Sequence, residues 1–344
     1  MPVSRIPREA RVAGVMVRYL AALPPLSGSV LAVDDEAGAV EAELARGGAL
    51  VSAWRRRAVG DRPAHPWPPD GPFDAATLRL PKGRECLRMA LHATVSRIRP
   101  GGSLWLYGSN DEGVRSAGKL LGSVLGEVRT VETRGHCRFW RAVRRAEPDQ
   151  LRSDLSDWES RFTLELPGGA VQLLSYPGLF AHGRLDDGTR LRIGSLPGKL
   201  PGARVLDFGC GAGAIALALR RRFPEAELDL VDSDALAVEA SRRNLPGIRV
   251  HLGDAWSALP SSARFDLIVS NPPFHRGKEE DFQLINRLID GAAQRLRRRG
   301  ELLVVAQRRI ALGRWLGDRF AAVRVESESR GYRLWLAAQS LWRG

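Results

Sequence analysis

Four stretches in the first half of this chain recur in the same order in its second half. The matches pair VLAVDDEAGAV (30–40) with VLDFGCGAGAI (205–215), Phe73 and Asp74 with Phe265 and Asp266, 99–108 with 297–306, and 134–140 with 330–336. Pro81 also falls opposite Pro273. Such an ordered repeat predicts two copies of one domain. The alternative, that any two α/β halves share these patterns, stays open on sequence alone.

The second half alternates apolar runs typical of strands with segments of helical period. The segments are RVLDFGCGAGAIALALRRRF (204–223), ELDLVDSDALAVEASRRN (227–244), IRVHLGDAW (248–256), RFDLIVSNPPF (264–274), a helical stretch to about Arg299, and GELLVVAQ (300–307). This order predicts an α/β fold in which helices cover both faces of a doubly wound, mainly parallel sheet. Ligands of such sheets bind at the carboxyl ends of the strands.

The boundary between the two copies is expected at 147–165, where the sequence is polar and follows the last repeated strand. This gives one domain over 1–150 and a second over 151–344. The proline-rich stretch 62–72 lies inside the first copy, where it predicts a surface loop because prolines donate no ladder hydrogen bonds.

The chain carries 52 Lys and Arg residues against 39 Asp and Glu residues, a formal net charge of +13. This excess favours a polyanionic partner such as nucleic acid, although base composition of the genome could also produce it. The apolar runs are too short to span a membrane, and the N-terminus lacks a signal-peptide pattern, which predicts a cytoplasmic protein. Three widely spaced cysteines (Cys86, Cys137 and Cys210) argue against a disulfide framework or a metal site.

A glycine-rich turn follows the first strand of the second copy. Gly209, Gly211 and Gly213 permit a tight turn and a close backbone approach to a ligand, and the next helix presents free N–H groups. Asp232 ends the next strand, where a carboxylate can accept both hydroxyls of a ribose. Asp254, after the third strand, is placed to accept a hydrogen bond from the exocyclic amine of adenine.

A dinucleotide site is the rival interpretation of this turn, since glycines followed by an acidic residue also describe NAD sites. Asp207, however, precedes the turn at the strand end, where it would repel a pyrophosphate and attract an ammonium group. The first copy has Ala32, Asp34 and Glu36 opposite Asp207, Gly209 and Gly211, and only Gly38 persists, opposite Gly213. We therefore expect the first copy to bind no cofactor.

The strand FDLIVS ends in the tetrapeptide Asn271-Pro272-Pro273-Phe274. The Asn271 side-chain oxygen and the Pro272 carbonyl can accept the two hydrogens of a planar amine, and prolines stiffen the turn that presents them. Phe274 offers a flat face for stacking an unpaired base. A simple strand-ending turn is the alternative, and His275 is assigned no chemistry.

These motifs resemble two nested families. The glycine turn with its carboxylates is similar to class I S-adenosylmethionine-dependent methyltransferases. The sequence NPPFHRG, with PGLFAHGRLDDGTRLRI (177–193) upstream and a degenerate first copy, resembles the ribosomal RNA guanine-N2 methyltransferases. The likeness is strong over 177–307 and weaker over 28–145, where GSNDEGVRSAGK (108–119) fits best. A short region after Pro273 and the basic segment 308–320 depart from the family pattern, which leaves the RNA site open.

The resemblance implies two tandem Rossmann-like methyltransferase domains, of which the first is degenerate. It implies S-adenosylmethionine as cofactor, with Asn271 beside it, and a target guanine held by Asn271, Pro272, Pro273 and Phe274. Phe180, Arg184 and Asp186 either close over the site or form a structural latch. Basic residues beside aromatic ones in the first copy suit RNA, namely Arg55 to Arg57 beside Trp54, and Arg138 and Arg141 beside Phe139 and Trp140.

The expected activity is methylation of a guanine N2 amine in 16S ribosomal RNA, with ribosomal RNA or the small ribosomal subunit as partner and a monomer as the working state. The alternatives are a 23S ribosomal RNA guanine-N2 methyltransferase, a protein glutamine-N5 methyltransferase and a non-catalytic RNA-binding assembly factor. The duplicated domain and the charge count against the glutamine enzyme. The combination of Asp207, Gly209 and Asn271 counts against an assembly factor.

Overall fold

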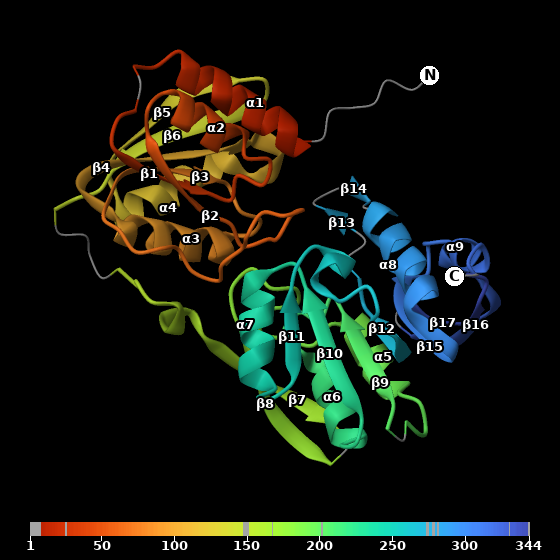
Figure 1. The fold of residues 1–344 in the computed structure, drawn as a ribbon. Coiled ribbons are helices and arrows are strands. Elements are labelled where there is room, and N and C mark those ends of the chain that lie inside the picture. Colours follow the sequence, from red (N-terminus) through yellow and green to blue (C-terminus); the bar gives the residue numbers. More distant parts are fainter. Residues whose placement is uncertain are drawn as a thin grey trace, which may run out of the picture. The chain divides into compact units, whose positions relative to one another are not determined.

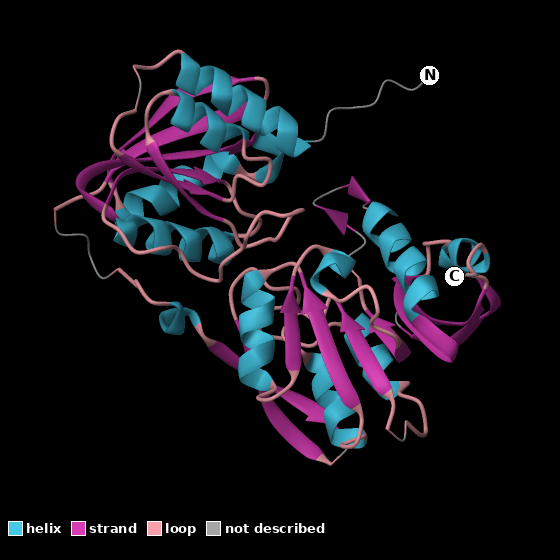
Figure 2. Ribbon diagram, in the orientation of Figure 1, coloured by secondary structure: helices cyan, strands magenta, loops and turns pink. Residues whose placement is uncertain are grey.

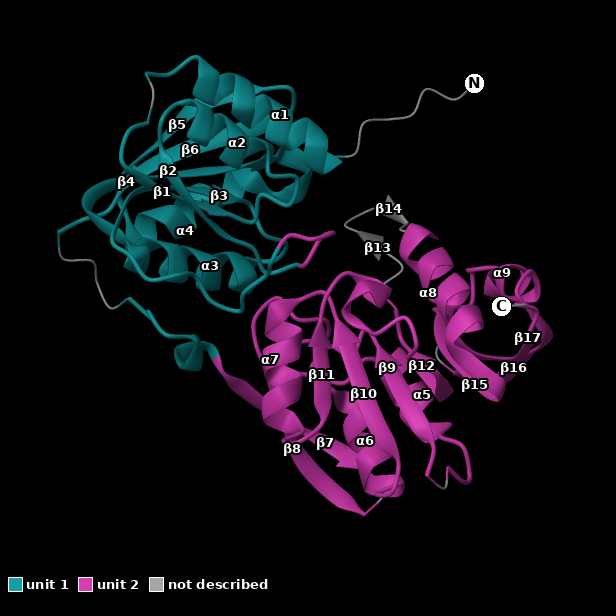
Figure 3. Cartoon of the chain, viewed as in Figure 1, with its two compact units in different colours: residues 1–57, 63–158 teal, residues 58–62, 159–344 magenta. Residues whose placement is uncertain are grey.

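The computed structural model describes residues 8–24, 26–146, 151–166, 168–200, 202–272, 275–276, 279–280, 282–329 and 331–342. The chain divides into two compact units (Figure 3), unit 1 with residues 1–57 and 63–158 and unit 2 with residues 58–62 and 159–344. The short segment 58–62 joins unit 2, where the Ala58 N–H donates to the Ser233 carbonyl at 2.8 Å. No helix among the described residues is long and apolar enough to cross a membrane.

Unit 2 is built on a seven-stranded sheet of order β11-β10-β9-β12-β15-β17-β16 (Figure 1). Its strands are β9 (Arg204–Phe208), β10 (Glu227–Asp232), β11 (Arg249–Leu252), β12 (Phe265–Ser270), β15 (Leu296–Gln307), β16 (Phe320–Ser329) and β17 (Tyr332–Ser340). The first five run parallel, and β17 pairs antiparallel with both β15 and β16. The prediction of a doubly wound, mainly parallel sheet is therefore confirmed.

Helices cover both faces of this sheet (Figure 2), as the near-continuous apolar runs of its central strands require. One core packs α5 (Asp187–Gly194), α6 (Ala214–Arg222) and α7 (Ala235–Asn244) against one face. A second core packs α8 (Phe282–Arg295) and α9 (Leu312–Gly317) against the other. A hairpin of β7 (Ser160–Leu166) and β8 (Gly169–Ser175) precedes α5, and β13 (His275–Arg276) pairs with β14 (Glu279–Glu280).

Unit 1 repeats this plan with a six-stranded sheet of order β2-β1-β3-β4-β6-β5. The strands are β1 (Ser29–Val33), β2 (Leu50–Trp54), β3 (Phe73–Arg79), β4 (Ile98–Ser109), β5 (Gly126–Arg134) and β6 (Cys137–Val143). The helices α1 (Arg8–Ala21) and α2 (Ala39–Arg46) cover one face, and α3 (Arg84–Arg97) and α4 (Ala117–Val124) cover the other. A loop over 55–72 occupies the place that α7 and β11 have in unit 2.

The hydrogen-bond registers of the two sheets agree with the sequence repeat. Val30 pairs with Ala75 in unit 1, as Val205 pairs with Leu267 in unit 2. A register shift occurs in β3 between Phe73 and Ala75, and the same shift occurs in β12 between Phe265 and Leu267. The sequence repeat therefore extends to the strand pairing of the two sheets.

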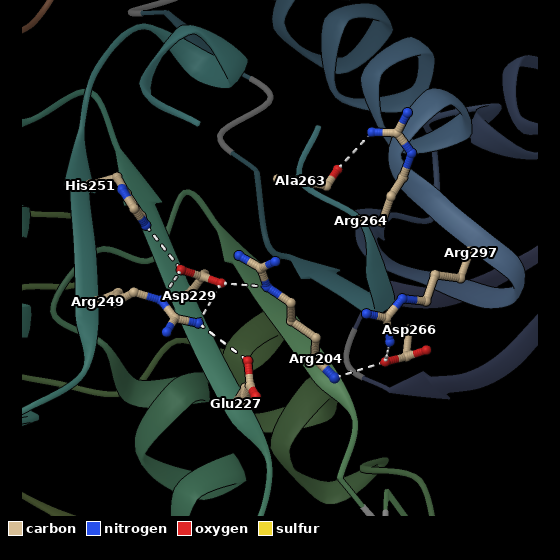
Figure 4. Close-up of polar contacts among 9 residues, drawn as sticks. All are labelled: Arg204, Glu227, Asp229, Arg249, His251, Ala263, Arg264, Asp266 and Arg297. Atoms are coloured by element: carbon tan, nitrogen blue, oxygen red, sulfur yellow. Dashed lines mark hydrogen bonds and ion pairs between the residues drawn. The ribbon is translucent and has the colours of Figure 1, made fainter. Parts of the chain in front are cut away.

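A carboxylate pin recurs at the same place in each unit. In unit 2, Asp266 accepts hydrogen bonds from the Arg204 N–H at 2.8 Å and from Arg297 Nη1 at 2.7 Å (Figure 4). In unit 1, Asp74 accepts from the Ser29 N–H at 2.7 Å and pairs with Arg99 Nε at 2.9 Å. In unit 2 this carboxylate links the start of β9 to the start of β15. In unit 1 it links the start of β1 to the start of β4.

The last repeated stretch is displaced by one residue from the sequence alignment. Leu106 pairs with Trp140 across β4 and β6, and Val304 pairs with Trp335 across β15 and β17. Each tryptophan lies under a helical glycine, since a Cβ on Gly118 would lie 2.7 Å from Trp140 Cη2 and one on Gly313 would lie 2.6 Å from Trp335 Cη2. Packing thus equates Trp140 with Trp335, whereas the sequence match set Trp140 opposite Leu336.

Candidate active site

The strand register of unit 2 brings the two predicted motifs together. Val269 pairs with Asp207 and Ser270 pairs with Phe208 across the parallel strands β12 and β9. The next residues of the two strands, Asn271 and Gly209, therefore leave the same edge of the sheet side by side. Asn271 is half-buried and Pro272 is buried. Pro273 and Phe274 lie outside the described residues.

The glycine turn uses backbone conformations that favour glycine. Gly209, Gly211 and Gly213 have φ values of 72°, 55° and 84°. A Cβ on Gly213 would also lie 2.9 Å from Leu245 Cδ1, so helix α7 packs close against the turn. The Asp232 carboxylate closes the turn by accepting from the Gly211 N–H at 2.9 Å, and it accepts from the Asp234 N–H at 2.9 Å.

Asp207 is buried at the end of β9, and neither of its carboxylate oxygens meets full hydrogen-bond geometry with a described residue, although the Ala216 N–H lies close enough to lower its pKa. Burial raises the pKa of Asp207 to about 7, and the nearby Arg192 guanidinium opposes that shift. Arg192 lies on α5 and is fully buried, with its Nε and Nη2 also unpartnered in the described part of the chain. Burial lowers the pKa of Arg192 to about 10, although Asp207 acts in the opposite direction.

Buried polar groups nearly always have partners, and of the Arg192 guanidinium only Nη1 has one, the Ser195 carbonyl at 3.3 Å. The incompletely satisfied Asp207 carboxylate and Arg192 guanidinium in one core therefore require a reason. The amino-acid end of S-adenosylmethionine carries an ammonium group and a carboxylate, whose charges complement Asp207 and Arg192. These residues therefore fit that cofactor. Sequence reasoning identified Asp207 but missed Arg192, because an arginine in a helical segment carries no signal of burial.

Asp254 follows β11 and has partners of its own. Its Oδ1 pairs with Arg287 Nη2 of α8 at 3.0 Å, and the Gly60 N–H approaches its Oδ2 at 3.4 Å. An adenine amine at this position would have to share the carboxylate with Arg287. The residue after Asp254 is Ala255, whose φ of 57° turns the chain sharply as it leaves the strand.

The Asn271 amide is held by the first turn of α5. Its Nδ2 donates to Asp186 Oδ1 at 3.1 Å and to Thr189 Oγ1 at 3.0 Å. Asp186 also caps α5, since its Oδ1 accepts from the Gly188 and Thr189 N–H groups at 3.0 and 3.1 Å. Asp186 therefore contacts the predicted acceptor residue. Sequence reasoning missed Thr189, although an aspartate three residues before a threonine is an N-cap signal.

The other residues of the upstream segment lie on a loop before α5. Phe180 is exposed, and the following Ala181 has a φ of 53°. His182 tethers this loop to β8 through its Nδ1, 2.9 Å from Ser175 Oγ. Arg184 lies in the same loop and is exposed. Closure over the site and a purely structural role both remain compatible with this arrangement.

Unit 1 fills the corresponding positions with its own side chains. Asp34 retains a positive φ of 55°, and the next residue, Asp35, is buried and accepts from the N–H groups of Val40 and Glu41 at 2.8 and 3.0 Å. The first turn of α2 thus donates to a carboxylate of the same chain. Asp34 and Asp35 thus make internal contacts at the turn where unit 2 has Gly209 and Cys210.

Arg79 stands in unit 1 where unit 2 has Asn271. It is buried and forms hydrogen bonds with Glu9 of α1 at 3.0 Å and with Glu112 at 2.7 Å. Burial acts to lower the pKa of Arg79, but Glu9 and Glu112 outweigh it and hold the pKa above its ordinary value. The end of β3 is therefore a closed ion-pair cluster.

The predicted RNA contact at Arg55 to Arg57 is wrong for Arg55 and Arg56, whereas Arg57 is exposed. Arg55, Arg56 and Trp54 are all buried, and Arg55 pairs with Glu41 and with the Asp35 carbonyl. The basic pattern there supports the closed turn. The second predicted cluster is more accessible, because Arg138 and Trp140 are partly exposed and the Arg138 guanidinium lies 5.5 Å from the Trp140 ring centroid. Arg141 lies 5.6 Å from the Trp105 ring instead, and Phe139 is buried.

The three cysteines are buried free thiols. Within the described ranges, no group of three or more His, Cys, Asp or Glu side chains is arranged to hold a metal ion. The chemistry of the candidate site therefore depends on the carboxylates, the glycine turn and the Asn271 amide that the parallel strands bring together.

Comparisons with known proteins agree with this geometry. The model of the methyltransferase small domain matches residues 170–335, and that of its N-terminal domain matches residues 58–162. The ribosomal RNA small subunit methyltransferases C of Stutzerimonas stutzeri and Pseudomonas aeruginosa are each 38% identical over 276 residues, 79% of this chain and 81% of theirs.

Among solved structures, a 16S rRNA N2 guanine methyltransferase of T. thermophilus, in complex with AdoMet and guanosine, matches with a TM-score of 0.83. It is 25% identical, and the match covers 98% of this chain and 92% of that one. The match spans both units, as does the sequence likeness to the bacterial relatives. The chain belongs to the ribosomal RNA small subunit methyltransferase C family.

Proposed function

We propose that this protein transfers a methyl group from S-adenosylmethionine to the exocyclic N2 amine of a guanine in 16S ribosomal RNA, and that unit 2 carries the reaction. The observation that carries this proposal is the register of β9 and β12, which sets Asn271 beside Gly209. The names of the matched relatives favour the small subunit over the large one and RNA over a protein glutamine.

The cofactor site in this proposal combines the turn at Gly209, Gly211 and Gly213 with three carboxylates. Asp207 binds the ammonium group, Asp232 the ribose hydroxyls and Asp254 the adenine amine. Bound S-adenosylmethionine supplies an electrophilic methyl group on a sulfonium. The buried, incompletely satisfied state of Asp207 supports its assignment, because an ammonium ligand would satisfy a carboxylate that otherwise lacks full hydrogen-bond geometry with any described residue.

The target amine needs orientation more than activation. The nitrogen lone pair of guanine N2 is delocalised into the ring, so a nearby methyl donor alone meets the wrong orbital. Asn271 Oδ1 and the Pro272 carbonyl accept the two amine hydrogens, which turns the lone pair toward the donor and stabilises positive charge on nitrogen. Stacking on Phe274 next to Pro273 holds the base. The methylated amine is acidic and loses its proton to water, so no strong general base is required.

Unit 1 in this proposal binds no cofactor and serves RNA engagement or structural support. Two features support this. The Asp35 carboxylate accepts from the N–H groups of the first turn of α2, which a cofactor would need, and Arg79 fills the strand end, where a target would bind, with ion pairs. The partly exposed Arg138 and Trp140 offer a cation and a ring edge for RNA. A cytoplasmic location and a monomeric state complete the proposal, and sedimentation of the purified protein tests the latter.

The proposal is tested in cells and with purified components. Deleting the gene should remove one N2-methylguanosine from 16S ribosomal RNA by mass spectrometry, and the wild-type gene should restore it. Asn271→Ala should fail to restore it while binding S-adenosylmethionine with near-normal affinity in calorimetry. Unchanged 16S modification in the deletion strain would refute the substrate, and full turnover by Asn271→Ala would refute the acceptor role.

A further inference from the structure

The orientation of the Asn271 amide is determined by the chemistry of its neighbours. A carboxylate can only accept hydrogen bonds, so the nitrogen of the amide must face Asp186. The second amide hydrogen points to Thr189 Oγ1, 3.0 Å away. Both donors of the Asn271 side chain are therefore engaged by α5. The amide oxygen Oδ1 keeps its acceptor capacity, since it accepts no hydrogen bond from any described residue.

Gly188 completes this arrangement by its lack of a side chain. A Cβ at this position would lie 3.1 Å from Asn271 Oδ1 and 3.0 Å from Asp186 Oδ1. Such an atom would crowd the amide oxygen and the carboxylate at once. The first turn of α5 therefore provides two acceptors for the amide nitrogen and space beside the amide oxygen.

We propose that Asp186 and Thr189 are positioning residues for methyl transfer, which hold the Asn271 amide so that its oxygen faces the exocyclic amine of the target base. This inference rests on the proposed function of Asn271. Donation from the amide to an ionised carboxylate also polarises the amide and strengthens its oxygen as an acceptor. Positive charge that develops on the attacked nitrogen is thereby stabilised more than the neutral ground state is.

Two substitutions separate this role from helix capping. Asp186→Ser retains a favourable N-cap, but its shorter side chain loses the contact with Asn271. Thr189→Val preserves the shape and removes the acceptor. Thr163→Val is a matched control, because Thr163 Oγ1 accepts from the Gln172 amide at 2.9 Å in the exposed β7–β8 hairpin of the same unit.

The measurements are single-turnover methylation of unmodified 16S ribosomal RNA, calorimetric affinity for S-adenosylmethionine and thermal unfolding. We expect Thr189→Val to lower the rate constant about 10-fold and the double variant with Asp186→Ser about 100-fold, scaled down from direct loss of a transition-state hydrogen bond. Cofactor affinity and melting temperature should stay near those of the wild type, and Thr163→Val should leave the rate constant unchanged.

The outcomes distinguish this inference from the proposed function. A fully active double variant beside an inactive Asn271→Ala would overturn the positioning role and leave the acceptor role intact. An active Asn271→Ala would overturn both. A parallel loss of cofactor affinity and rate in Thr189→Val would assign Thr189 to cofactor binding and reject the inference for that residue.

Discussion

The two units make the same kind of helix-to-strand contact at a strand end, but only in unit 2 does this contact leave a hydrogen-bonding group available. In each unit, the helix that precedes the first strand of the sheet contacts a residue at the end of the strand that neighbours that first strand. In unit 1, Glu9 of α1 forms an ion pair with Arg79, and in unit 2, Asp186 at the start of α5 accepts from Asn271. The first contact closes the sheet edge with paired charges. The second leaves the Asn271 amide oxygen available, so the identity of the residue at the strand end decides whether the contact is purely structural or can serve a reaction.

The largest expected effect comes from giving unit 2 the turn of unit 1. Gly209→Asp introduces the residue that unit 1 carries at the equivalent position, where Asp34 adopts a φ of 55°. The added side chain and charge should weaken S-adenosylmethionine binding at least about 100-fold, through steric exclusion and repulsion of the cofactor carboxylate. Isothermal titration calorimetry measures the change.

Gly247→Asp is the matched control for that substitution. Gly247 has a φ of 81° in unit 2, and no atom lies within 4 Å of its added Cβ. The backbone strain is then similar, but the site is remote from the glycine turn. Equal loss of binding in both variants would mean that strain, and not the changed turn, separates the two units.

Asp207 should make the affinity of unit 2 for S-adenosylmethionine depend on pH. Unit 1 has Ala32 at the equivalent position and lacks this titrating group. With a pKa of about 7, Asp207 gains charge as pH rises, and its ionised form attracts an ammonium ligand. Affinity for S-adenosylmethionine should therefore rise about 20-fold between pH 5.5 and 7.5, a range below the usual pKa of an α-amino group. Calorimetry across this range checks the slope.

Asp207→Asn should bind more weakly and lose this pH dependence. In the protein without ligand, the same titration should change folding stability in the opposite direction to the change in affinity. A carboxyl whose pKa is raised on folding costs stability once it ionises, so wild-type stability should fall as pH rises from about 4 to about 7. A slope in affinity that persists in Asp207→Asn would assign the titration to another group.

A buried carboxylate in β10 has no equivalent in unit 1. Burial acts to raise the pKa of Asp229, but hydrogen bonds from Arg249, His251 and Arg204 lower it to about 2 (Figure 4). Asp229→Asn should cost about 2 kcal/mol of unfolding free energy at pH 7. That contribution is present above pH 4 and declines as pH falls through about 2, which denaturant titrations at several pH values measure.

The register places Ser52 of unit 1 opposite Leu31, as it places Asp229 opposite Leu206. Ser52→Ala is therefore the paired variant, and it should change stability by much less than Asp229→Asn. Comparable losses in the two variants would show that the strand position, and not the charge cluster, determines the cost.

The smallest effect is expected from the pins, where the two units agree. Asp74→Asn and Asp266→Asn should each lower the melting temperature by a small and similar amount, because both carboxylates accept a strand N–H and contact an arginine near the surface. Differential scanning calorimetry compares them. A large difference between the two would indicate that the pins have diverged in role despite their common geometry.

The sequence predicted the parallel strands of unit 2 because their apolar runs and intervening helical periods are long and regular. It also identified Asp207 and Asn271, since a carboxylate before a glycine turn and an asparagine before two prolines are rare local patterns. Residues that act through three-dimensional neighbours escaped it. Thr189 contacts Asn271 and Arg192 becomes buried only when α5 packs on the sheet, which no local pattern predicts. Arg55 can be buried because it pairs with Glu41.

The repeat itself was read correctly in order but not in every register. The match that set Trp140 opposite Leu336 followed the letters, whereas the sheet equates Trp140 with Trp335 because each ring fills the space above a glycine. Packing constrains ring positions more tightly than local composition does. Likewise, composition does not reveal that Arg55 is buried beside Glu41 or that Arg56 is buried beside Cys86.

If unit 1 binds no cofactor, as proposed above, the Asp35 cap of α2 keeps the stability of this unit independent of metabolite supply. A carboxylate tethered five residues from the amide it binds acts at a high effective concentration, so free anions in the cell hardly compete with it. In unit 2 the proposed occupant is a free ligand, which at 100 times its dissociation constant would add about 2.7 kcal/mol to the stability of the unit. The stability of unit 2 would thus vary with the concentration of the methyl donor, while the stability of unit 1 would stay constant.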